Sequence, residues 1–302
     1  MRKIVLLLFT TFLTAGLLTA CSGNSGSDDK SVTVGAKNYT AQYILSKITT
    51  LYLEDNGYDV EEVNGMGSTA LRKALENDQV DFTWEYTGTA LVTYLDQDPI
   101  VEPEKSFEEV KKIDEDNDLI WMNMSDINNT YALALKEEKA EELGLETISD
   151  LAEYVNNNPD EISMAMDPEF AERADGIKGA EELYDFELGS DNIKEMKTGL
   201  QYGAIDKGEV NSVMVFTTDA QIKEFDLRVL EDDKGFFPAY HAAVSMREDV
   251  YEDDPELEDL TADIAEKLSS ETMINLTYQV DIEDKKVDDV AEKWLEEQGL
   301  LD

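Results

Sequence analysis

The chain has 302 residues, of which 25 are Lys or Arg and 69 are Asp or Glu, so its formal net charge at pH 7 is −44. This acidity argues against binding to nucleic acids, whose phosphate backbones it repels, and a single Cys and a single His argue against a disulfide framework or a Cys/His metal cluster. Hydrophobic residues make up 42% of the chain, enough for a folded core, and nothing in the composition predicts a metal or a cofactor.

The first twenty residues have the pattern of a secretory signal. Two basic residues precede an apolar run from Ile4 to Leu18, and Cys21 follows shortly after that run. The run is short for a membrane-spanning helix. The next residues are rich in Ser and Gly, which is typical of a flexible tether. The sequence therefore predicts a signal peptide over residues 1–20 and a tether over residues 21–31.

Strand-like and helix-like segments alternate in the first part of the exported chain. We expect strands at residues 32–34, 60–63 and 80–86, with helices that begin at the N-cap candidates Thr40 and Ser68. Such alternation favours an α/β fold with a mainly parallel sheet, in which ligands bind at the carboxyl ends of the strands. The loops expected at that edge are residues 35–39, 65–67 and 86–89.

The alternation restarts in the middle of the chain. The expected elements are a helix at 143–154, a strand at 162–166, helices at 176–186 and 198–207, a strand at 210–216, a helix at 218–225 and a strand at 227–230. Residues 236–246 read as extended, and two acidic helices are expected around 257–276 and 287–295. We therefore expect two lobes, each a mainly parallel sheet flanked by helices: lobe I from residues 32–130 and 237–302, and lobe II from residues 131–236.

Aromatic residues stand at four places where an expected strand ends or the chain crosses between lobes. Tyr86 ends a strand of lobe I, and Phe216 ends a strand of lobe II. Tyr131 lies where the chain enters lobe II, and Tyr240 lies where it returns to lobe I. Rings at such places can converge between two lobes, and each contributes roughly 0.5–2 kcal/mol of cation–π attraction in a desolvated site. This pattern favours a cage for a quaternary ammonium ion.

Several segments, taken in their order and spacing, resemble the substrate-binding proteins of osmoprotectant ABC transporters, which carry glycine betaine, carnitine or choline. The segments that carry the resemblance are VGAKNYT at 34–40, GSTAL at 67–71, WEYTGT at 84–89, NTYA at 129–132, FTTD at 216–219 and DDKGFFPAY at 232–240. The resemblance implies a two-lobed, type II periplasmic-binding-protein-like clamshell, with cage positions at Tyr86, Tyr131, Phe216 and Tyr240. At Phe216 the family commonly has Tyr, so we expect the cage to survive with an altered ligand preference.

The same resemblance implies a clamp for the carboxylate of a betaine, formed by Lys37, Thr89 and Arg173. Lys37 follows the first strand, and Thr89 is expected at a helix N-terminus, where anions are favoured. Arg173 would reach across from lobe II as a bidentate clamp. Asn129, two residues before Tyr131, is a further candidate that would orient the crossover.

The residues before Cys21 resemble a bacterial lipobox, which implies that Cys21 is diacylated and becomes the new N-terminus. Two acyl chains anchor a protein stably to a membrane. We therefore expect a lipoprotein on the extracytoplasmic face of the cell membrane, where it would deliver its solute to an ABC permease and catalyse no reaction.

Three other interpretations stay open at this point. A choline-preferring protein of the same class would need the cage but no carboxylate clamp. A tethered extracytoplasmic hydrolase would need a nucleophile–base pair, and His241, the one imidazole, has no nucleophile partner in sequence and is expected to pack beside the hinge. A purely structural surface lipoprotein would bind no small molecule.

Overall fold

The computed structural model describes residues 30–301. The predicted signal peptide, the lipidation site Cys21 and nearly all of the predicted tether lie outside the described residues. Within the described part, no helix combines the length and the apolar character that crossing a membrane requires.

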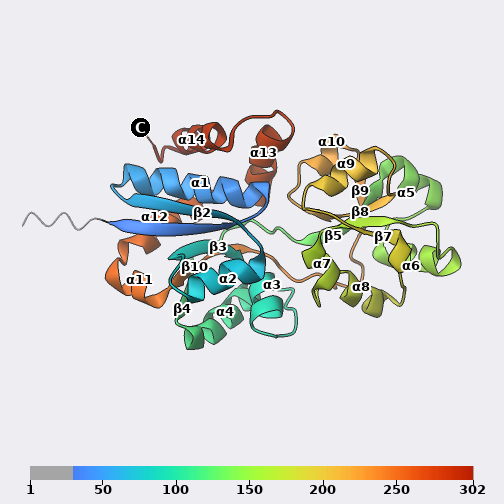
Figure 1. Cartoon of the computed structure of the whole chain (residues 1–302), viewed down its shortest axis with the longest axis horizontal. Coiled ribbons are helices and arrows are strands. Elements are labelled where there is room, and N and C mark those ends of the chain that lie inside the picture. Colours follow the sequence, from blue (N-terminus) through green and yellow to red (C-terminus); the bar gives the residue numbers. More distant parts are fainter. Residues whose placement is uncertain (1–29, 302) are drawn as a thin grey trace, which may run out of the picture.

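Two lobes, each built on one five-stranded sheet, lie side by side (Figure 1). The strands of the lobe I sheet are β1 (Ser31–Lys37), β2 (Asp59–Met66), β3 (Phe82–Tyr86), β4 (Leu119–Met122) and β10 (Ala242–Arg247), in the order β2-β1-β3-β10-β4. The strands of the lobe II sheet are β5 (Tyr131–Lys136), β6 (Met164–Met166), β7 (Ile193–Glu195), β8 (Ser212–Phe216) and β9 (Leu227–Val229), in the order β7-β6-β8-β5-β9. The predicted two-lobed α/β fold is confirmed.

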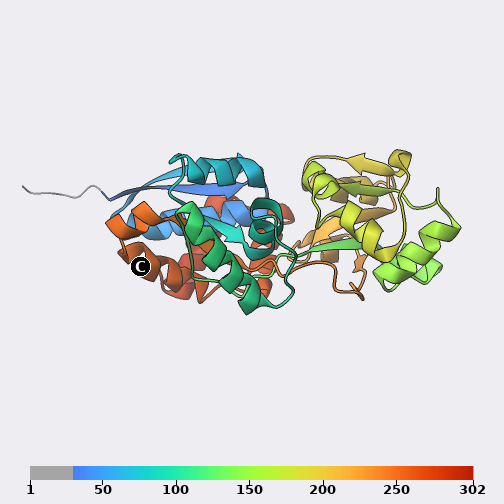
Figure 2. The same ribbon diagram turned by 90° about the horizontal axis from the view of Figure 1, so that it is seen from below.

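Helices cover both faces of each sheet, and the view from below shows the same division into two lobes (Figure 2). The helices of lobe I are α1 (Thr40–Asp55), α2 (Ser68–Glu76), α3 (Thr87–Thr89), α4 (Pro103–Asp114), α11 (Glu248–Asp253), α12 (Glu256–Ala265), α13 (Ser270–Asp281) and α14 (Val287–Gln298). The helices of lobe II are α5 (Glu137–Leu143), α6 (Ile148–Asn157), α7 (Pro168–Glu172), α8 (Ile177–Tyr184), α9 (Leu200–Asp206) and α10 (Gln221–Glu224).

The central strands are buried on both faces, which is why their sequences are nearly continuous apolar runs. Successive residues of β5 point to opposite sides of the sheet. Leu133 joins the core that also holds Leu151 of α6 and Ile177 of α8, whereas Ala134 joins the core that holds Tyr202 of α9. Each sheet is thus sandwiched between two layers of helices.

In each sheet one strand is antiparallel to the others. It is the first strand that the chain forms after crossing from the other lobe. β5 is antiparallel to β8 and β9, and β10 is antiparallel to β3 and β4. An antiparallel strand begins where its neighbour ends, so the register pairs Tyr131 with Phe216 and Ala242 with Tyr86. The starts of the crossover strands and the ends of their neighbours therefore meet at one edge.

Two segments that were each predicted as one helix form two. The segment 143–154 contains the end of α5, a turn and most of α6, because Gly144 adopts a left-handed conformation with φ 69° that ends α5. Thr147 then caps α6 by accepting the backbone N–H of Asp150, whose side chain bonds back in a capping box. Ser269 separates α12 from α13 in the same way, by accepting the backbone N–H of Thr272.

Other element boundaries also differ from the prediction. β1 begins at Ser31, the last residue of the predicted tether, and within residues 236–246 the strand begins only at Ala242. Thr40 and Ser68 are the first residues of their helices and not N-caps. The Thr40 hydroxyl instead donates a hydrogen bond of 2.7 Å to Asp281 of α13, which ties the start of α1 to the C-terminal part of lobe I.

Candidate ligand-binding site

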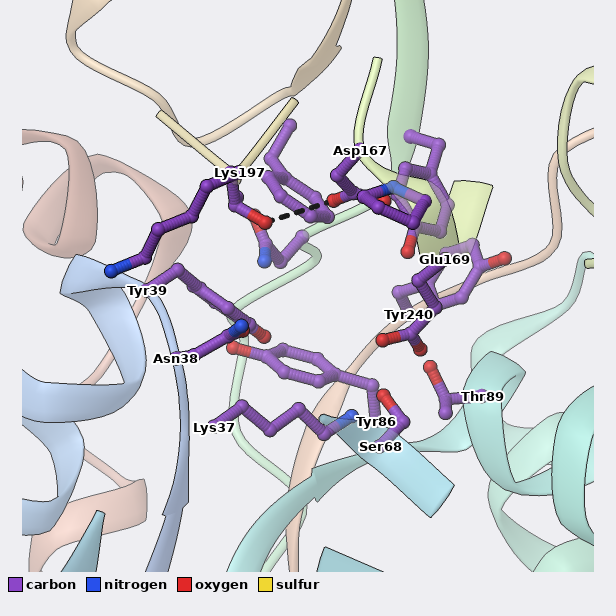
Figure 3. Close-up of a pocket in the computed structure, with 15 residues that line it drawn as sticks. Lys37, Asn38, Tyr39, Ser68, Tyr86, Thr89, Asp167, Glu169, Lys197 and Tyr240 are labelled. Atoms are coloured by element: carbon purple, nitrogen blue, oxygen red, sulfur yellow. Dashed lines mark hydrogen bonds between the residues drawn. The ribbon is translucent and has the colours of Figure 1, made fainter. Parts of the chain in front are cut away.

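A cavity of about 410 Å³ lies between the lobes, at the edge where the crossover strands begin (Figure 3). Among the described residues, all the predicted site residues except Arg173 line it. The lining residues are Lys37, Asn38, Tyr39, Ser68, Tyr86, Thr89 and Tyr240 from lobe I, Asn129 from the crossover, and Tyr131, Asp167, Pro168, Glu169, Lys197, Thr198 and Phe216 from lobe II. Segments distant in sequence therefore form one wall.

The four aromatic side chains predicted for the cage all border this cavity. The Tyr131 ring has its centroid 4.9 Å from that of Phe216 and 5.5 Å from that of Tyr240, the latter in an edge-to-face arrangement of 87°. The Tyr86 ring lies across the cavity in Figure 3. Burial raises the pKa of all three tyrosine hydroxyls, so they stay neutral at physiological pH. The cavity thus offers neutral π-faces from both lobes.

A fifth ring, Tyr39, joins this cluster and was not predicted. Its centroid lies 5.3 Å from that of Phe216 and 6.5 Å from that of Tyr86, in stacked arrangements. Because Tyr39 belongs to lobe I and Phe216 to lobe II, the stack spans the gap between the lobes. The sequence did contain a signal for Tyr39. It lies in the loop expected after the first strand, at the same edge of the sheet as Tyr86.

Lys37 lines the cavity and already forms an ion pair within the protein. Its Nζ lies 2.5 Å from the Glu85 carboxylate, and both side chains are buried. The same carboxylate also accepts the Tyr94 hydroxyl at 2.8 Å and the Tyr86 backbone N–H at 2.7 Å. A ligand carboxylate at this position would therefore share the Lys37 ammonium with Glu85.

Arg173 lies behind the cavity wall. Its guanidinium carbon is 5.4 Å from the ring centroid of Tyr131 and 5.8 Å from that of Tyr240. Two of its nitrogens form a fork on the Asp175 carboxylate, with Nε at 2.7 Å and Nη2 at 2.5 Å, so the bidentate face expected to hold a ligand is taken by the protein. Its Nη1 donates across the cleft to the Thr89 hydroxyl at 3.4 Å.

Asn129 and its neighbour connect the two crossover segments. The backbone N–H of Asn129 donates to the Tyr240 carbonyl at 3.0 Å, and its side-chain oxygen accepts the Thr218 hydroxyl. The Asn128 side chain accepts the Tyr240 backbone N–H at 2.9 Å. His241 bonds through Nδ1 to the Ser125 carbonyl at 3.0 Å and is not among the lining residues. These contacts set the position of the Tyr240 ring.

Two carboxylates on the cavity wall were not predicted. Asp167 caps α7 by accepting the Phe170 backbone N–H at 2.8 Å, and it also accepts the Thr198 hydroxyl at 3.0 Å (dashed in Figure 3). Burial raises the pKa of Asp167. Glu169, two residues further, accepts a bond from Arg173. The Asp-Pro pair after an expected strand was the signal for a helix start here.

Gly88 is required where the chain turns beneath Tyr240. A Cβ at this position would lie 2.9 Å from the Ala239 carbonyl oxygen and 2.9 Å from the Tyr240 ring. We expect Gly88→Ala to lower the free energy of unfolding by about 1–3 kcal/mol, because neighbouring atoms must shift to admit the methyl group. Urea denaturation measures this loss. Gly67→Ala, where a Cβ would meet nothing within 4 Å, is the matched control and should stay near wild type.

Asp219 holds the end of β8 from which the Phe216 ring projects. Its carboxylate accepts the Phe216 backbone N–H at 3.1 Å and the Tyr202 hydroxyl. Burial is the main cause that raises the pKa of Asp219 from 3.8 to about 7; the bonds from Tyr202 and Phe216 lower it, and the nearby charge of Asp281 raises it.

This raised pKa predicts a pH-dependent stability that Asp219→Asn removes. Between the ordinary pKa of 3.8 and about 7 the folded state holds a proton that the unfolded state has released, so the wild type loses stability as the pH rises through this window. The difference in unfolding free energy between wild type and variant should fall by up to about 1.4 kcal/mol per pH unit from pH 5 to 7. A difference that stays constant across this range in urea titrations would contradict the assignment.

Comparison with known proteins identifies relatives of the whole described chain. A family model described as the substrate binding domain of ABC-type glycine betaine transport system matches residues 30–297. The glycine-betaine-binding protein of Pseudomonas aeruginosa is 41% identical over 298 residues, which are 96% of this chain and 96% of that protein. The ergothioneine transport permease/ergothioneine binding protein of Helicobacter pylori is 37% identical over 276 residues, which are 90% of this chain and 48% of that protein.

A solved structure shares the fold. A crystal structure of a glycine betaine/carnitine/choline ABC transporter superposes with a TM-score of 0.72 at 28% identity, over 90% of this chain and 100% of that chain. Binding proteins of this kind act outside the cytoplasm, together with a membrane permease. The resemblance seen in the sequence is confirmed, and the chain belongs to the family of substrate-binding domains of ABC-type glycine betaine transport systems.

Proposed function

We propose that this protein captures a quaternary ammonium solute, glycine betaine or carnitine, for osmoprotectant uptake by an ABC importer. The observation that carries the proposal is the meeting of Tyr86, Tyr131, Phe216 and Tyr240, from four separate stretches of chain, around one cavity between the lobes. A methylated ammonium donates no hydrogen bonds, so neutral π-faces suit it better than a carboxylate alone.

The anionic end of the solute would be held beside the cage. Lys37 and Thr89 line the cavity, and Arg173 approaches Thr89 from the opposite lobe. Micromolar binding corresponds to about 8 kcal/mol, which the rings alone do not supply. The contacts to the carboxylate and the closure of the lobes, of which the Tyr39 stack on Phe216 is part, would supply the rest.

The remaining parts of the proposal concern the cellular setting. The pattern around Cys21 supports a lipid anchor on the extracytoplasmic face of the cell membrane. The liganded, closed form would be the one that the permease recognises. The protein would bind and release its solute without reacting it, as the names of its relatives describe binding and not catalysis.

Calorimetric titration of the full chain with glycine betaine, carnitine, choline and ergothioneine tests this function. We expect the tightest binding for a betaine with a free carboxylate, and markedly weaker binding of choline because it lacks that group. Ergothioneine is included because a 37% identical relative is named for it. Absence of heat with every quaternary ammonium compound, in a protein that unfolds cooperatively, would reject the proposal.

A further inference from the structure

Glu169 carries a negative charge into the cavity from lobe II. It is the second residue of α7, whose start is fixed by the Asp167 cap, and a third of its side-chain surface is exposed (33%). In Figure 3 its carboxylate points across the cavity toward the hydroxyl groups of Ser68 and Thr89 in lobe I. A protein carboxylate therefore reaches the region assigned above to the carboxylate of the ligand.

The contacts of Glu169 are those that a ligand carboxylate would make. Arg173 Nη1 donates to Glu169 at 3.2 Å and to the Thr89 hydroxyl at 3.4 Å, so one guanidinium nitrogen serves both groups. Burial raises the pKa of Glu169, but the charge of Lys37, the Ser68 hydroxyl and Arg173 outweigh it and lower the pKa overall. Glu169 is thus an anion stabilised by Lys37 and Arg173, the two cations proposed to hold the anionic end of the solute.

The two cations proposed for the carboxylate clamp are already paired within the protein. Lys37 is paired with Glu85, and Arg173 is paired with Asp175 as well as with Glu169. Two anions about 4 Å apart in a partly desolvated site repel each other strongly. A carboxylate-bearing solute therefore either displaces the Glu169 side chain or binds against its charge, whereas a cation without a carboxylate meets only attraction from it.

We propose that Glu169 is an internal stand-in for the ligand carboxylate, which occupies the anion-binding groups of Lys37 and Arg173 and which a betaine displaces when it binds. This inference rests on the proposed function. It makes one residue responsible for the relative binding affinities for betaines and for cations that lack a carboxylate. The displacement lowers the affinity for betaines below what the cage and the clamp would otherwise give, and the same charge strengthens the attraction for choline.

The test compares Glu169→Gln with wild type in calorimetric titrations of the full chain with glycine betaine and with choline. Gln keeps the shape and the hydrogen-bonding capacity but removes the charge. We expect glycine betaine to bind about fivefold tighter and choline about fivefold weaker, since the removed charge repels one ligand's carboxylate and attracts the other ligand's cation. Opposite changes for two ligands are an effect that a general loosening of the site would not produce.

Glu172→Gln is the matched control. Glu172 belongs to the same helix, is 75% exposed and pairs with Lys178 at 3.2 Å, outside the cavity, so both affinities should stay at wild type. Glu169→Ala, checked for cooperative unfolding, replaces Glu169→Gln if the latter does not fold, and the same opposite changes are expected.

The outcomes separate this inference from the proposed function. Tighter betaine and weaker choline binding in Glu169→Gln, with the control unchanged, supports it, and the betaine titration alone decides when choline binds too weakly to measure. Weaker or unchanged betaine binding in Glu169→Gln overturns it, because Glu169 would then contact the solute favourably or not at all. A wild-type protein that binds neither compound rejects the proposed function itself.

Discussion

Replacing Tyr86 with alanine weakens the binding of glycine betaine by at least about tenfold, because one desolvated π-face of the cage contributes up to about 2 kcal/mol to holding the methylated nitrogen. Tyr86 is only 2% exposed and borders the cavity beside Tyr39. Isothermal titration calorimetry measures the change. Removal of so large a buried ring also lowers the free energy of unfolding by about 3–5 kcal/mol, so the titration is run below the unfolding transition of the variant.

Tyr86→Phe is the control that separates the ring from its hydroxyl. Among the described residues the buried Tyr86 hydroxyl has no hydrogen-bond partner, so its removal breaks no bond within the protein. The Phe variant keeps the π-face and should bind glycine betaine within about threefold of wild type. A Phe variant as weak as the Ala variant would show that the hydroxyl, and not the ring, holds the solute.

Replacing Arg173 with alanine destabilises the protein by about 3–5 kcal/mol, which is the usual cost of removing one partner from a buried ion pair. The Arg173 and Asp175 side chains are 5% and 1% exposed, and the substitution would leave Asp175 buried without its main partner. The link from lobe II to Thr89 is lost as well, so betaine binding should also weaken. Urea denaturation and calorimetry measure the two effects.

The double variant Arg173→Ala, Asp175→Asn isolates the cause of the instability. It removes the uncompensated charge together with the cation, so a large part of the lost stability should return while betaine binding stays weak. If the double variant is no more stable than Arg173→Ala alone, the loss comes from packing against Tyr131 and Tyr240 and not from the ion pair.

The two-lobed α/β architecture was predictable because the local sequence patterns agree with it. Alternating strand-like and helix-like segments determine an α/β fold, and residues such as Tyr86 and Phe216 end apolar runs that are buried on both faces. The antiparallel direction of β5 and β10 was not predictable, because a short apolar run has the same pattern in a parallel and in an antiparallel strand. The breaks at Gly144 and Ser269 are visible only through capping residues, since apolar periodicity continues across them.

The candidate site was predictable only in part, for a related physical reason. Rings at the ends of parallel strands lie at one edge of a sheet, which brought Tyr86 and Phe216 into consideration, and the crossovers between the lobes brought in Tyr131 and Tyr240. Tyr39 and Glu169 were missed because their places in the cavity depend on how the two lobes meet. A pairing of Arg173 with a nearby carboxylate was conceivable from the sequence, but only as a surface contact, because burial of the Arg173–Asp175 pair cannot be read from two neighbouring charges.

We expect the rings around the cavity to hold a methylated nitrogen through its positive charge. Glycine betaine and its neutral-headed isostere 3,3-dimethylbutanoate have the same shape and the same carboxylate, and they differ in whether nitrogen or carbon carries the three methyl groups. Calorimetric titration of the wild-type chain with both compounds tests the claim directly. Cation–π attraction predicts that the isostere binds at least about tenfold more weakly, whereas equal affinities would show that the charge of the nitrogen does not contribute to binding.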